Sequence, residues 1–427
     1  MRCTTKSARP PRRMKPSGIP WLGDVPEDWT VLRLGFAVEK IVRKFDEDAP
    51  PLICSNKGKV VFRTEDTLGQ TSDREDGFQG VQPGDLCVHG MDTWHGAIAV
   101  SDISGKCTTV VHVCRSTKND VRFVSFYLQA LAFLKVYKAF SNGVRQNTSD
   151  FRSWKAASRI PLILPSLREQ QTIAAFLDGE VARVDALREK IKREIERLGD
   201  YKKSLIAETV TRGLRKRKMK PSGIPWLGDV PEGWEVTRLQ WHLEEVTELN
   251  CPVKTDFILS LTNDRGVIPY SEKGNQGNKA KEDISGYKIA FKNCIIANSM
   301  NIIIGSVGLS QYYGCVSPVY YVFKAKDSAD IRFINYIFQT SIFQRELRKY
   351  AKGILEIRLR ISASAILKQK IVLPSLDEQR EIAEYLDRAV SKIDAVVARR
   401  KVQLEKLEAF KRSLIQEYVT GKREVCQ

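Results

Sequence analysis

The longest regular pattern in this sequence is a seven-residue repeat of apolar side chains that follows Ser166. Large aliphatic residues recur every seventh position, at Leu177, Val184, Ile191, Leu198 and Leu205. Ile173, Val181, Leu187 and Ile195 fill intervening positions of the same stripe, and charged residues cover the other faces. Successive heptads of this kind predict a long helix with a coiled-coil seam, which needs a partner helix. Ser166 and Glu169 form a capping-box pattern at its start, and the helix is expected to end near Gly213.

A second apolar stripe of the same kind follows Ser375. Its seam consists of Leu386, Val390, Ile393, Val397, Leu404, Leu407 and Leu414. Two seamed helices of about 40 residues can satisfy each other as an antiparallel coiled coil roughly 60 Å long. The two helices are therefore predicted to form a spacer that holds the rest of the chain in a fixed arrangement.

Shorter, mixed patterns precede each stripe. Before the first there are β-like runs at 96–100 and 108–113 and a helical run from Phe123 to Phe140; before the second there are β-like runs at 302–305 and 319–323 and a helical run from Ile331. These patterns predict two α+β domains, mostly β with helices and with irregular polar loops.

The chain is an internal repeat. Lys15 to Trp29 recurs as Lys220 to Trp234, and only Asp28 versus Gly233 differs. A Leu-Pro-Ser-Leu-x-Glu-Gln hinge recurs as well, from Leu164 and from Leu373. Self-similarity on this scale means two copies of one structural unit. The stretches between the Pro-Trp segment and the hinge keep a common frame but not their polar residues, as expected of two readers of different targets.

This organisation gives a set of predicted boundaries. We expect a flexible basic tail at 1–14, a first α+β domain at 15–160, a central helical spacer at 161–215, a second α+β domain at 216–364 and a distal helical spacer at 365–427. The two domains and two helices are related by a pseudo-twofold internal repeat.

Composition narrows the class of partner. A formal net charge of +18 favours a polyanion, with nucleic acid ahead of an anionic membrane, although a merely basic protein is the alternative. The 9 cysteines are scattered without a Cys-x-x-Cys pair, which is typical of a reducing compartment. Neither a secretory signal nor an apolar run of transmembrane length is present, so a cytoplasmic location without a membrane partner is expected.

No catalytic motif is recognisable. The sequence lacks a phosphate-binding Gly-x-x-x-x-Gly-Lys-Ser/Thr loop, a Gly-x-Gly-x-x-Gly dinucleotide fingerprint and the Asp/Asn-Pro-Pro-aromatic loop of amino methyltransferases. Cys87, His89 and His95 are metal ligands by type, but no fourth ligand follows at zinc-like spacing, so no metal site is predicted. We therefore expect a non-catalytic chain with no cofactor of its own.

Nucleic-acid binding has better support. Arginine, asparagine and glutamine read base edges, while lysine, arginine and threonine contact phosphates. Such residues gather in polar and glycine-rich loops of both domains, although a solvated surface loop is the alternative for any one of them. The candidate DNA-binding residues are Lys57, Lys59, Arg63, Asn142, Arg145, Gln146, Asn147, Thr148, Arg152, Asn263, Arg265, Lys273, Asn275, Gln276, Asn278, Lys279, Asn301, Arg358 and Arg360.

The tandem half-repeat, the Pro-Trp-Leu-Gly-x-x-Pro-x-x-Trp segment, the hinge and the long helix after each hinge together resemble the specificity subunit of Type I restriction-modification systems. The resemblance covers nearly the whole chain. It implies two target recognition domains that each read half of a split, asymmetric double-stranded DNA site. It also implies a single copy of this chain per complex with two methyltransferase subunits, to which two restriction subunits can be added. S-adenosylmethionine, ATP and Mg²⁺ would then belong to those partners.

Two alternatives stay open on the sequence. The same kind of subunit could serve a modification-only or other DNA-targeting system, which a neighbouring nuclease gene would discriminate. A coiled-coil scaffold is the alternative without DNA, and it predicts no sequence preference. The sequence gives neither the target nor the length of the gap between its halves.

Overall fold

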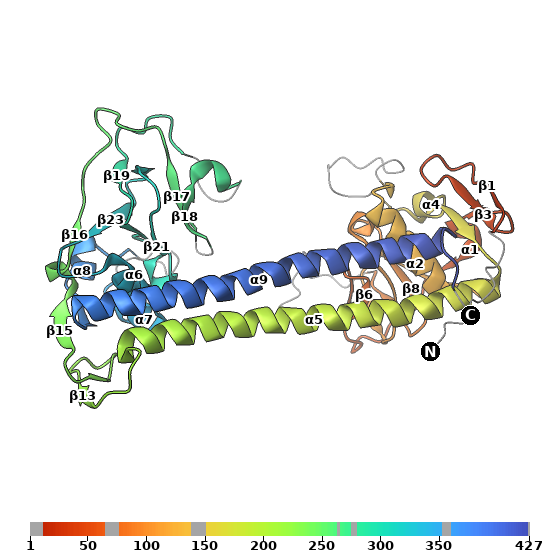
Figure 1. Cartoon of the computed structure of the whole chain (residues 1–427). Helices are drawn as coiled ribbons and strands as arrows, with labels where there is room; N and C mark the ends of the chain where they lie inside the picture. Colours follow the sequence, from red (N-terminus) through yellow and green to blue (C-terminus); the bar gives the residue numbers. More distant parts are fainter. Residues whose placement is uncertain are drawn as a thin grey trace, which may run out of the picture. The chain divides into compact units, whose positions relative to one another are not determined.

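The computed structural model describes residues 12–64, 77–137, 151–262, 265–274, 280–351 and 360–425. The chain divides into two compact units, Met1–Ile191 with Val402–Gln427 (unit 1) and Lys192–Lys401 (unit 2). Each unit holds one Pro-Trp segment, one α+β domain and portions of the two long helices, α5 (Leu167–Arg212) and α9 (Leu376–Val419) (Figure 1). The predicted α+β class with two long helices is confirmed.

The α+β part of unit 1 is built from short elements. In chain order they are β1 (Met14–Pro16), β2 (Asp24–Pro26), β3 (Thr30–Arg33), α1 (Leu34–Ala37), β4 (Glu39–Ile41), β5 (Leu52–Ser55), β6 (Lys59–Phe62), β7 (Gln79–Val81), β8 (Leu86–His89), η2 (Thr93–His95), β9 (Ile98–Val100), β10 (Gly105–Cys107), β11 (Val111–Arg115), α2 (Val121–Phe133), α4 (Trp154–Ala157) and β12 (Pro161–Leu164).

Unit 2 repeats this order with few additions. Its elements are β13 (Met219–Pro221), β14 (Asp229–Pro231), β15 (Glu235–Arg238), η3 (Leu239–Trp241), β16 (Leu243–Glu245), β17 (Leu259–Thr262), β18 (Gly266–Pro269), η4 (Tyr270–Glu272), β19 (Lys288–Ala290), β20 (Ile295–Asn298), η5 (Ile302–Ile304), β21 (Val307–Leu309), β22 (Gly314–Val316), β23 (Tyr320–Ala325), α6 (Ile331–Gln339), α7 (Ser341–Arg348), α8 (Ala363–Leu367) and β24 (Lys370–Leu373).

The two units share one sheet topology. Unit 1 has a four-stranded antiparallel sheet in the order β4-β11-β8-β9, and unit 2 has its counterpart in the order β16-β23-β20-β21. Around these sheets, the pairs β1-β2, β3-β12, β5-β6 and β7-β10 match β13-β14, β15-β24, β17-β18 and β19-β22. The common frame inferred from the sequence repeat is therefore a common fold.

Three local predictions were wrong. Residues 302–304 form the 3-10 helix η5, because Gly305 follows with φ +90° and turns the chain before β21. Helix α2 ends at Phe133, well before Phe140, because Lys135 takes a left-handed conformation with φ 57°. The basic tail does not extend to 14: the guanidinium of Arg12 bonds Asp28 and Glu169, and Met14 already lies in β1.

Buried glutamines join each hinge to its domain. Gln170 donates its side-chain amide to the Pro165 carbonyl (2.9 Å) and accepts from the Asp120 backbone N–H (2.9 Å). Gln379 makes the same two bonds, to Pro374 (3.0 Å) and from Asp330 (2.9 Å). Because Asp120 and Asp330 cap α2 and α6, each hinge glutamine fixes the start of a long helix to the first helix of its domain.

The helix starts follow the capping prediction in part. Ser166 Oγ accepts from the Glu169 backbone N–H at 3.3 Å, and Ser375 Oγ accepts from that of Glu378 at 3.4 Å. The glutamate side chains do not close a capping box; Glu169 binds Arg12 and Glu378 binds Arg217. These matched arginines come from the segment before each Pro-Trp segment.

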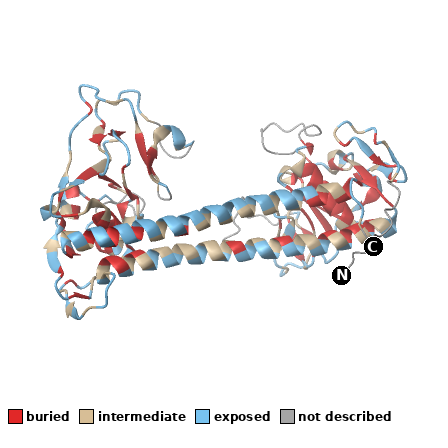
Figure 2. Ribbon diagram, viewed as in Figure 1, coloured by how far each residue is buried: buried red, intermediate tan, exposed pale blue. Residues whose placement is uncertain are grey.

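The predicted seam is buried to different degrees. Leu177, Val184, Ile191, Leu386, Ile393 and Leu414 are buried, whereas Leu198, Leu205, Val390, Val397, Leu404 and Leu407 are half-buried (Figure 2). Leu187 is 41% exposed, so its placement in the seam was wrong. The heptad continues through Arg188 and Lys202 instead. Both pair with carboxylates on α9, Arg188 with Glu408 in unit 1 and Lys202 with Asp394 in unit 2.

The far end of each long helix packs on a Pro-Trp segment. In unit 1, Trp29 is buried against Phe123 of α2, and a Cβ on Gly421, just after α9, would lie 3.4 Å from the Trp29 ring and 2.4 Å from Pro26. In unit 2, a Cβ on Gly213 would lie 3.1 Å from Trp234. Both glycines have φ near +70°, the left-handed conformation that ends a helix. Among the described residues, no helix is long and apolar enough to cross a membrane.

Candidate nucleic-acid interface

In each unit the chain meets the four-stranded sheet again at an equivalent position, Phe151 after α2 in unit 1 and Ile361 after α6 and α7 in unit 2. We call this position the return point. In unit 1, the Phe151 N–H donates to the Gly90 carbonyl at 2.9 Å, at the end of β8. In unit 2, the Ile361 N–H donates to the Ser299 carbonyl at 3.1 Å, just after β20. The predicted DNA-binding residues Arg152 and Arg360 stand next to these two anchor points and are exposed.

A second hydrogen bond holds each return point from the neighbouring strand. His112 on β11 is buried, and its Nε2–H donates to the Phe151 carbonyl at 2.5 Å. Tyr321 on β23 donates its hydroxyl to the Ile361 carbonyl at 2.9 Å. Burial lowers the pKa of His112, against the opposing effect of that hydrogen bond. The imidazole is therefore neutral near pH 7, and its Nε2–H is a fixed donor.

The return point lies beside a short connection that carries further candidates. In unit 1 the connection runs from Gly90 through η2 to Gly96, and a Cβ on Gly90 would touch Arg152 backbone atoms at 3.0 Å. In unit 2 the counterpart runs from Ser299 through η5 to Gly305. Asn301, a predicted DNA-binding residue, precedes η5 and is exposed. The structure thus gathers Arg360 and Asn301 at one point of unit 2.

A β-hairpin forms the other flank of this region in unit 1. Lys57 lies in the β5-β6 turn and Lys59 begins β6; both are exposed. A Cβ on Gly96 would lie 4.0 Å from the carbonyl oxygen of Asn56 in the same turn. The turn therefore meets the connection at Gly96, while Arg152 meets it at Gly90.

The corresponding hairpin of unit 2 is β17-β18. Its turn carries Arg265, which is exposed and pairs with Glu272 at 2.7 Å. Gly266 beside it faces Gly308 on β21, since a Cβ on Gly308 would lie 3.3 Å from the Gly266 Cα. The two hairpins occupy matching places but present different side chains.

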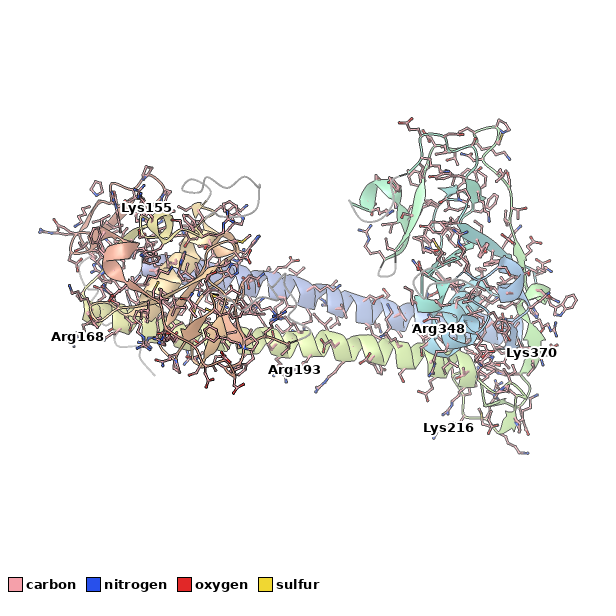
Figure 3. The ribbon with its side chains drawn as sticks, turned by 180° about the vertical axis from the view of Figure 1, so that it is seen from behind. Lys155, Arg168, Arg193, Lys216, Arg348 and Lys370 are labelled. Carbon is pink, nitrogen blue, oxygen red and sulfur yellow. The ribbon has the colours of Figure 1, made fainter. Side chains whose placement is uncertain are left out.

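The remaining described candidates lie at the margins of this region. Arg63 follows β6 and is half-buried, with its backbone N–H bonded to the Pro51 carbonyl at 2.9 Å. Lys273 follows η4 and stands 5.3 Å over the Tyr270 ring. Lys155, three residues after Arg152 on α4, is exposed and adds positive charge (Figure 3).

Many predicted DNA-binding residues lie outside the described residues. They are Asn142, Arg145, Gln146, Asn147, Thr148, Asn263, Asn275, Gln276, Asn278, Lys279 and Arg358. Residue 151 directly follows the first of these stretches, and residue 360 directly follows the last. Their assignment stays a prediction from sequence.

A buried ion cluster stabilises the unit 1 sheet at the other end of β8 from Gly90. Asp85 is fully buried and bonds Arg43 at 2.7 Å, the Gln82 backbone N–H at 2.7 Å and Arg115. Burial raises the pKa of Asp85, but the hydrogen bonds from Arg43, Gln82 and Arg115 outweigh it and lower the pKa overall. The equivalent position in unit 2 is the buried Cys294, so the two sheets are supported by different chemistry.

Two of the three side chains weighed as metal ligands, Cys87 and His89, have structural surroundings of their own. Cys87 is buried in the sheet core, and burial raises the pKa of its thiol. His89 Nδ1 accepts from the Asp92 backbone N–H at 3.0 Å. Over the ranges that the structure describes, no group of three or more His, Cys, Asp or Glu side chains is placed to hold a metal ion.

Sequence reasoning missed the residues that position the candidates. His112 and Tyr321 are separated by the same number of residues as the two hinges, yet their unlike side chains give no sign of a shared role. Phe36 and Trp241 were also missed; they are 78% and 62% exposed at matching places in α1 and η3. The signal was present as Arg-Leu-x-aromatic in both copies, at Arg33–Phe36 and Arg238–Trp241.

Comparison with known proteins shows the family to which this chain belongs. A family model described as the Type I restriction modification DNA specificity domain matches the chain twice, at residues 26–197 and 231–406. The Type I restriction enzyme MjaVIII specificity subunit of Methanocaldococcus jannaschii is 24% identical over 93% of this chain and 93% of its own. The putative type I restriction enzyme MjaX specificity subunit of the same organism is 23% identical over 94% and 95%.

Solved structures agree at the level of fold. A chain from a structure of the type I R-M system, described for its assembly and conformational transition, has a TM-score of 0.67 at 16% identity, covering 93% of this chain and 99% of that one. The HsdS subunit of Thermoanaerobacter tengcongensis has a TM-score of 0.50 at 18% identity, covering 93% and 98%. Both family matches contain the return points and hairpins described above.

Proposed function

Because this chain belongs to the Type I restriction-modification DNA specificity family, we propose that the return point, connection and hairpin of each unit read one half of a split DNA site. The chain is the specificity subunit, the DNA-recognition component, of such a system. One unit would read each half of a bipartite, asymmetric target.

The observation that carries this proposal is one backbone frame with two sets of side chains. Arg152 in unit 1 corresponds to Ser362 in unit 2, and the Lys57 turn corresponds to the Arg265 turn, while strands and hydrogen-bonded return points are kept. A scaffold would have no reason to change the side chains at these turns while the backbone frame is kept. Two readers of different base sequences would vary them, because base edges are distinguished by side-chain donors and acceptors.

The chemistry of the candidates divides between base and phosphate contacts. Arg152, Arg265 and Arg360 can form the bidentate bonds that select guanine, and Asn301 can select adenine. Lysines such as Lys57, Lys59 and Lys273 suit phosphate oxygens, which position the protein without reading sequence. With a net charge of +18, binding should weaken steeply with salt as counterions are released.

Catalysis is assigned to partner subunits. We infer one copy of this chain with two methyltransferase subunits, and two restriction subunits where the host encodes them. Those partners would hold S-adenosylmethionine, ATP and Mg²⁺ and would flip the target adenine out of the duplex. The role of this chain is then to choose the site and to hold the partners on it.

The long helices supply the gap between the half-sites in this proposal. Helices α5 and α9 each run from one unit into the other, and ion pairs join them within each unit. A helix pair of fixed length would set the number of base pairs that is spanned without being read.

The test is selection of DNA from a random pool by the purified complex of this chain with the host's type I methyltransferase subunit. The proposal predicts enrichment of two short motifs separated by a constant gap. Enrichment of a single continuous motif would contradict the two-reader arrangement. An unenriched pool, with salt-independent binding, would favour the scaffold alternative.

A further inference from the structure

In each unit a short helical turn, α1 (Leu34–Ala37) or η3 (Leu239–Trp241), carries one exposed aromatic side chain. We call this turn with its ring the knob. Phe36 is 78% exposed on α1 and Trp241 is 62% exposed on η3. The residue two positions before each, Leu34 or Leu239, is fully buried. The Leu34 N–H bonds the Ile160 carbonyl at 2.8 Å, and the Leu239 N–H bonds the Gln369 carbonyl at 3.0 Å. Anchored in this way, the knob cannot fold its ring into the core.

An exposed aromatic is ordinary by itself; the repetition is not. The two knobs occupy equivalent places after β3 and β15, and each follows an exposed valine on that strand, Val31 or Val236. Between the copies Gly35 has become Gln240 and Ala37 has become His242, so the segment has been free to change. The exposed aromatic is nevertheless present in both.

Basic side chains lie near both knobs. In unit 1, Phe36 lines a hollow of about 210 Å³ together with Arg115, Lys118 and one acidic residue, Glu39. In unit 2, Lys326 donates to the Gln240 carbonyl at 3.0 Å, directly beside Trp241. Exposed basic residues also flank the strands that carry the knobs: Arg33 and Arg159 in unit 1, and Arg238, Lys368 and Lys370 in unit 2. Lys370 is labelled in Figure 3.

We propose that Phe36 and Trp241 are the anchor residues by which the chain docks two copies of one protein partner, its methyltransferase subunit. Each copy would receive the ring in an apolar pocket and meet the basic rim with acidic side chains. An aromatic side chain that fills a pocket at the centre of an interface is a typical hot spot. This inference rests on the proposed function, and it adds the residues and the surface chemistry.

DNA is the weaker occupant for these knobs. Residues that read two different half-sites are expected to differ between the units, as the hairpin turns do, whereas the aromatic knob is kept. Duplex DNA offers phosphates to the basic rim but no apolar pocket for a ring beside a valine. A partner present in two identical copies, by contrast, needs the same anchor twice.

The test uses the full-length chain and the host's type I methyltransferase subunit, with binding followed by native mass spectrometry and by titration. Phe36→Ala and Trp241→Ala should each weaken one of two binding events by about thirtyfold, leaving a complex with one methyltransferase copy. The double variant should lose both copies. Phe62→Ala, which removes a 49% exposed aromatic on β6 that has no aromatic counterpart, is the matched control and should keep both.

A charge variant provides an independent arm. Lys118→Glu should weaken the same binding event as Phe36→Ala, and more so at low salt, because the acidic rim of the partner would be repelled. Thermal unfolding of every variant should match that of the wild type, since exposed substitutions are close to neutral.

Three outcomes would overturn the docking inference. Two methyltransferase copies could bind both single variants with wild-type affinity. Phe62→Ala could lose a copy as readily as Phe36→Ala. The knob variants could instead lose affinity for DNA when the partner is absent, while still binding the partner, which would make the knobs nucleic-acid contacts.

Failure of the proposed function is distinguishable. If the wild-type complex selects no split motif while the knob variants lose methyltransferase copies, the docking surface is supported and the proposed recognition of a split site is contradicted. If the wild-type complex selects a split motif while the variants keep both methyltransferase copies, the proposed recognition of a split site is supported and the docking surface is contradicted.

Discussion

His112 of unit 1 and Tyr321 of unit 2 occupy the same position in their sheets, and each donates a hydrogen bond to the carbonyl of the returning chain, at 2.5 and 2.9 Å. An imidazole in one unit and a phenol in the other thus supply the same hydrogen bond to the returning chain. The difference has a consequence for acid stability, because only the histidine titrates near neutral pH.

Unit 1 should therefore lose stability as the pH falls below about 6.5, the usual histidine pKa in an unfolded chain. Burial lowers the pKa of His112 in the folded state, and the charges of Lys40 and His89 lower it further. The unfolded state then binds a proton that the folded state does not, so stability present above the unfolded pKa is lost as the pH falls towards the folded pKa. Hydrogen exchange of β8 and β11 at pH 7.5 and 5.5 measures this loss.

The variant His112→Gln keeps an N–H donor without the titration and should show a smaller difference between the two pH values. A residual difference is expected from His89, whose pKa burial also lowers. An unchanged difference would show that His112 does not carry the effect.

The seam contains an ion pair that is repeated by the internal symmetry. Lys411 bonds both carboxylate oxygens of Asp185 at 2.9 Å, and Lys202 bonds those of Asp394 at 2.8 and 2.7 Å. Polar residues in a seam specify register at a cost in stability. Lys411→Met should destabilise unit 1 by about 1–2 kcal/mol, because the half-buried Asp185 keeps only its weaker contact with Arg188.

Thermal unfolding measures that loss, with Lys203→Met as the control. Lys203 is 75% exposed and pairs with Asp200 on its own helix at 3.6 Å, so its loss should cost less than about 0.5 kcal/mol. Equal effects of the two substitutions would mean that the seam pair is no better than a surface pair.

Half-site reading should be separable by unit. Arg265→Ala should relax selection at one position of one half-site by about 1–3 kcal/mol and leave the other half-site unchanged. Arg152→Ala should do the same for the opposite half. Selection from a random DNA pool gives both readouts, and loss of preference in both halves from either substitution would contradict independent readers.

The gap between half-sites should follow the length of the helix pair. Deleting one heptad from each helix, 192–198 and 398–404, shortens the pair by about 10 Å, which corresponds to about three base pairs. Both half-sites should be unchanged and the gap shorter. A gap of wild-type length in the shortened variant would show that the helix pair does not set the gap between the half-sites.

Much of the fold follows from the sequence because the strongest signals are periodic and duplicated. The heptads predicted α5 and α9, and the repeated Pro-Trp segment predicted matching units. The short segments were less tractable: three isoleucines at 302–304 have strand propensity, but the left-handed Gly305 makes them a 3-10 turn. Leu187 was misplaced for a different reason, since interhelical pairing of Arg188 selects the seam position.

The candidate site was less predictable than the fold. Residue chemistry identified Arg152 in unit 1 and Asn301 and Arg360 in unit 2, but their placement at the sheet end of their own unit depends on backbone bonds from Phe151 and Ile361 that sequence does not reveal. His112 and Tyr321 show the general reason. A position can keep its function through a hydrogen bond to a carbonyl while the side chain that donates it changes completely.

A map of methylated adenines in host DNA, made by single-molecule sequencing with and without this chain beside the host's type I methyltransferase subunit, shows whether this chain selects the methylated sites. We predict a split motif with a fixed gap, present with the chain and lost on its deletion. A methylation pattern that does not change on deletion would contradict the assignment of site selection to this chain.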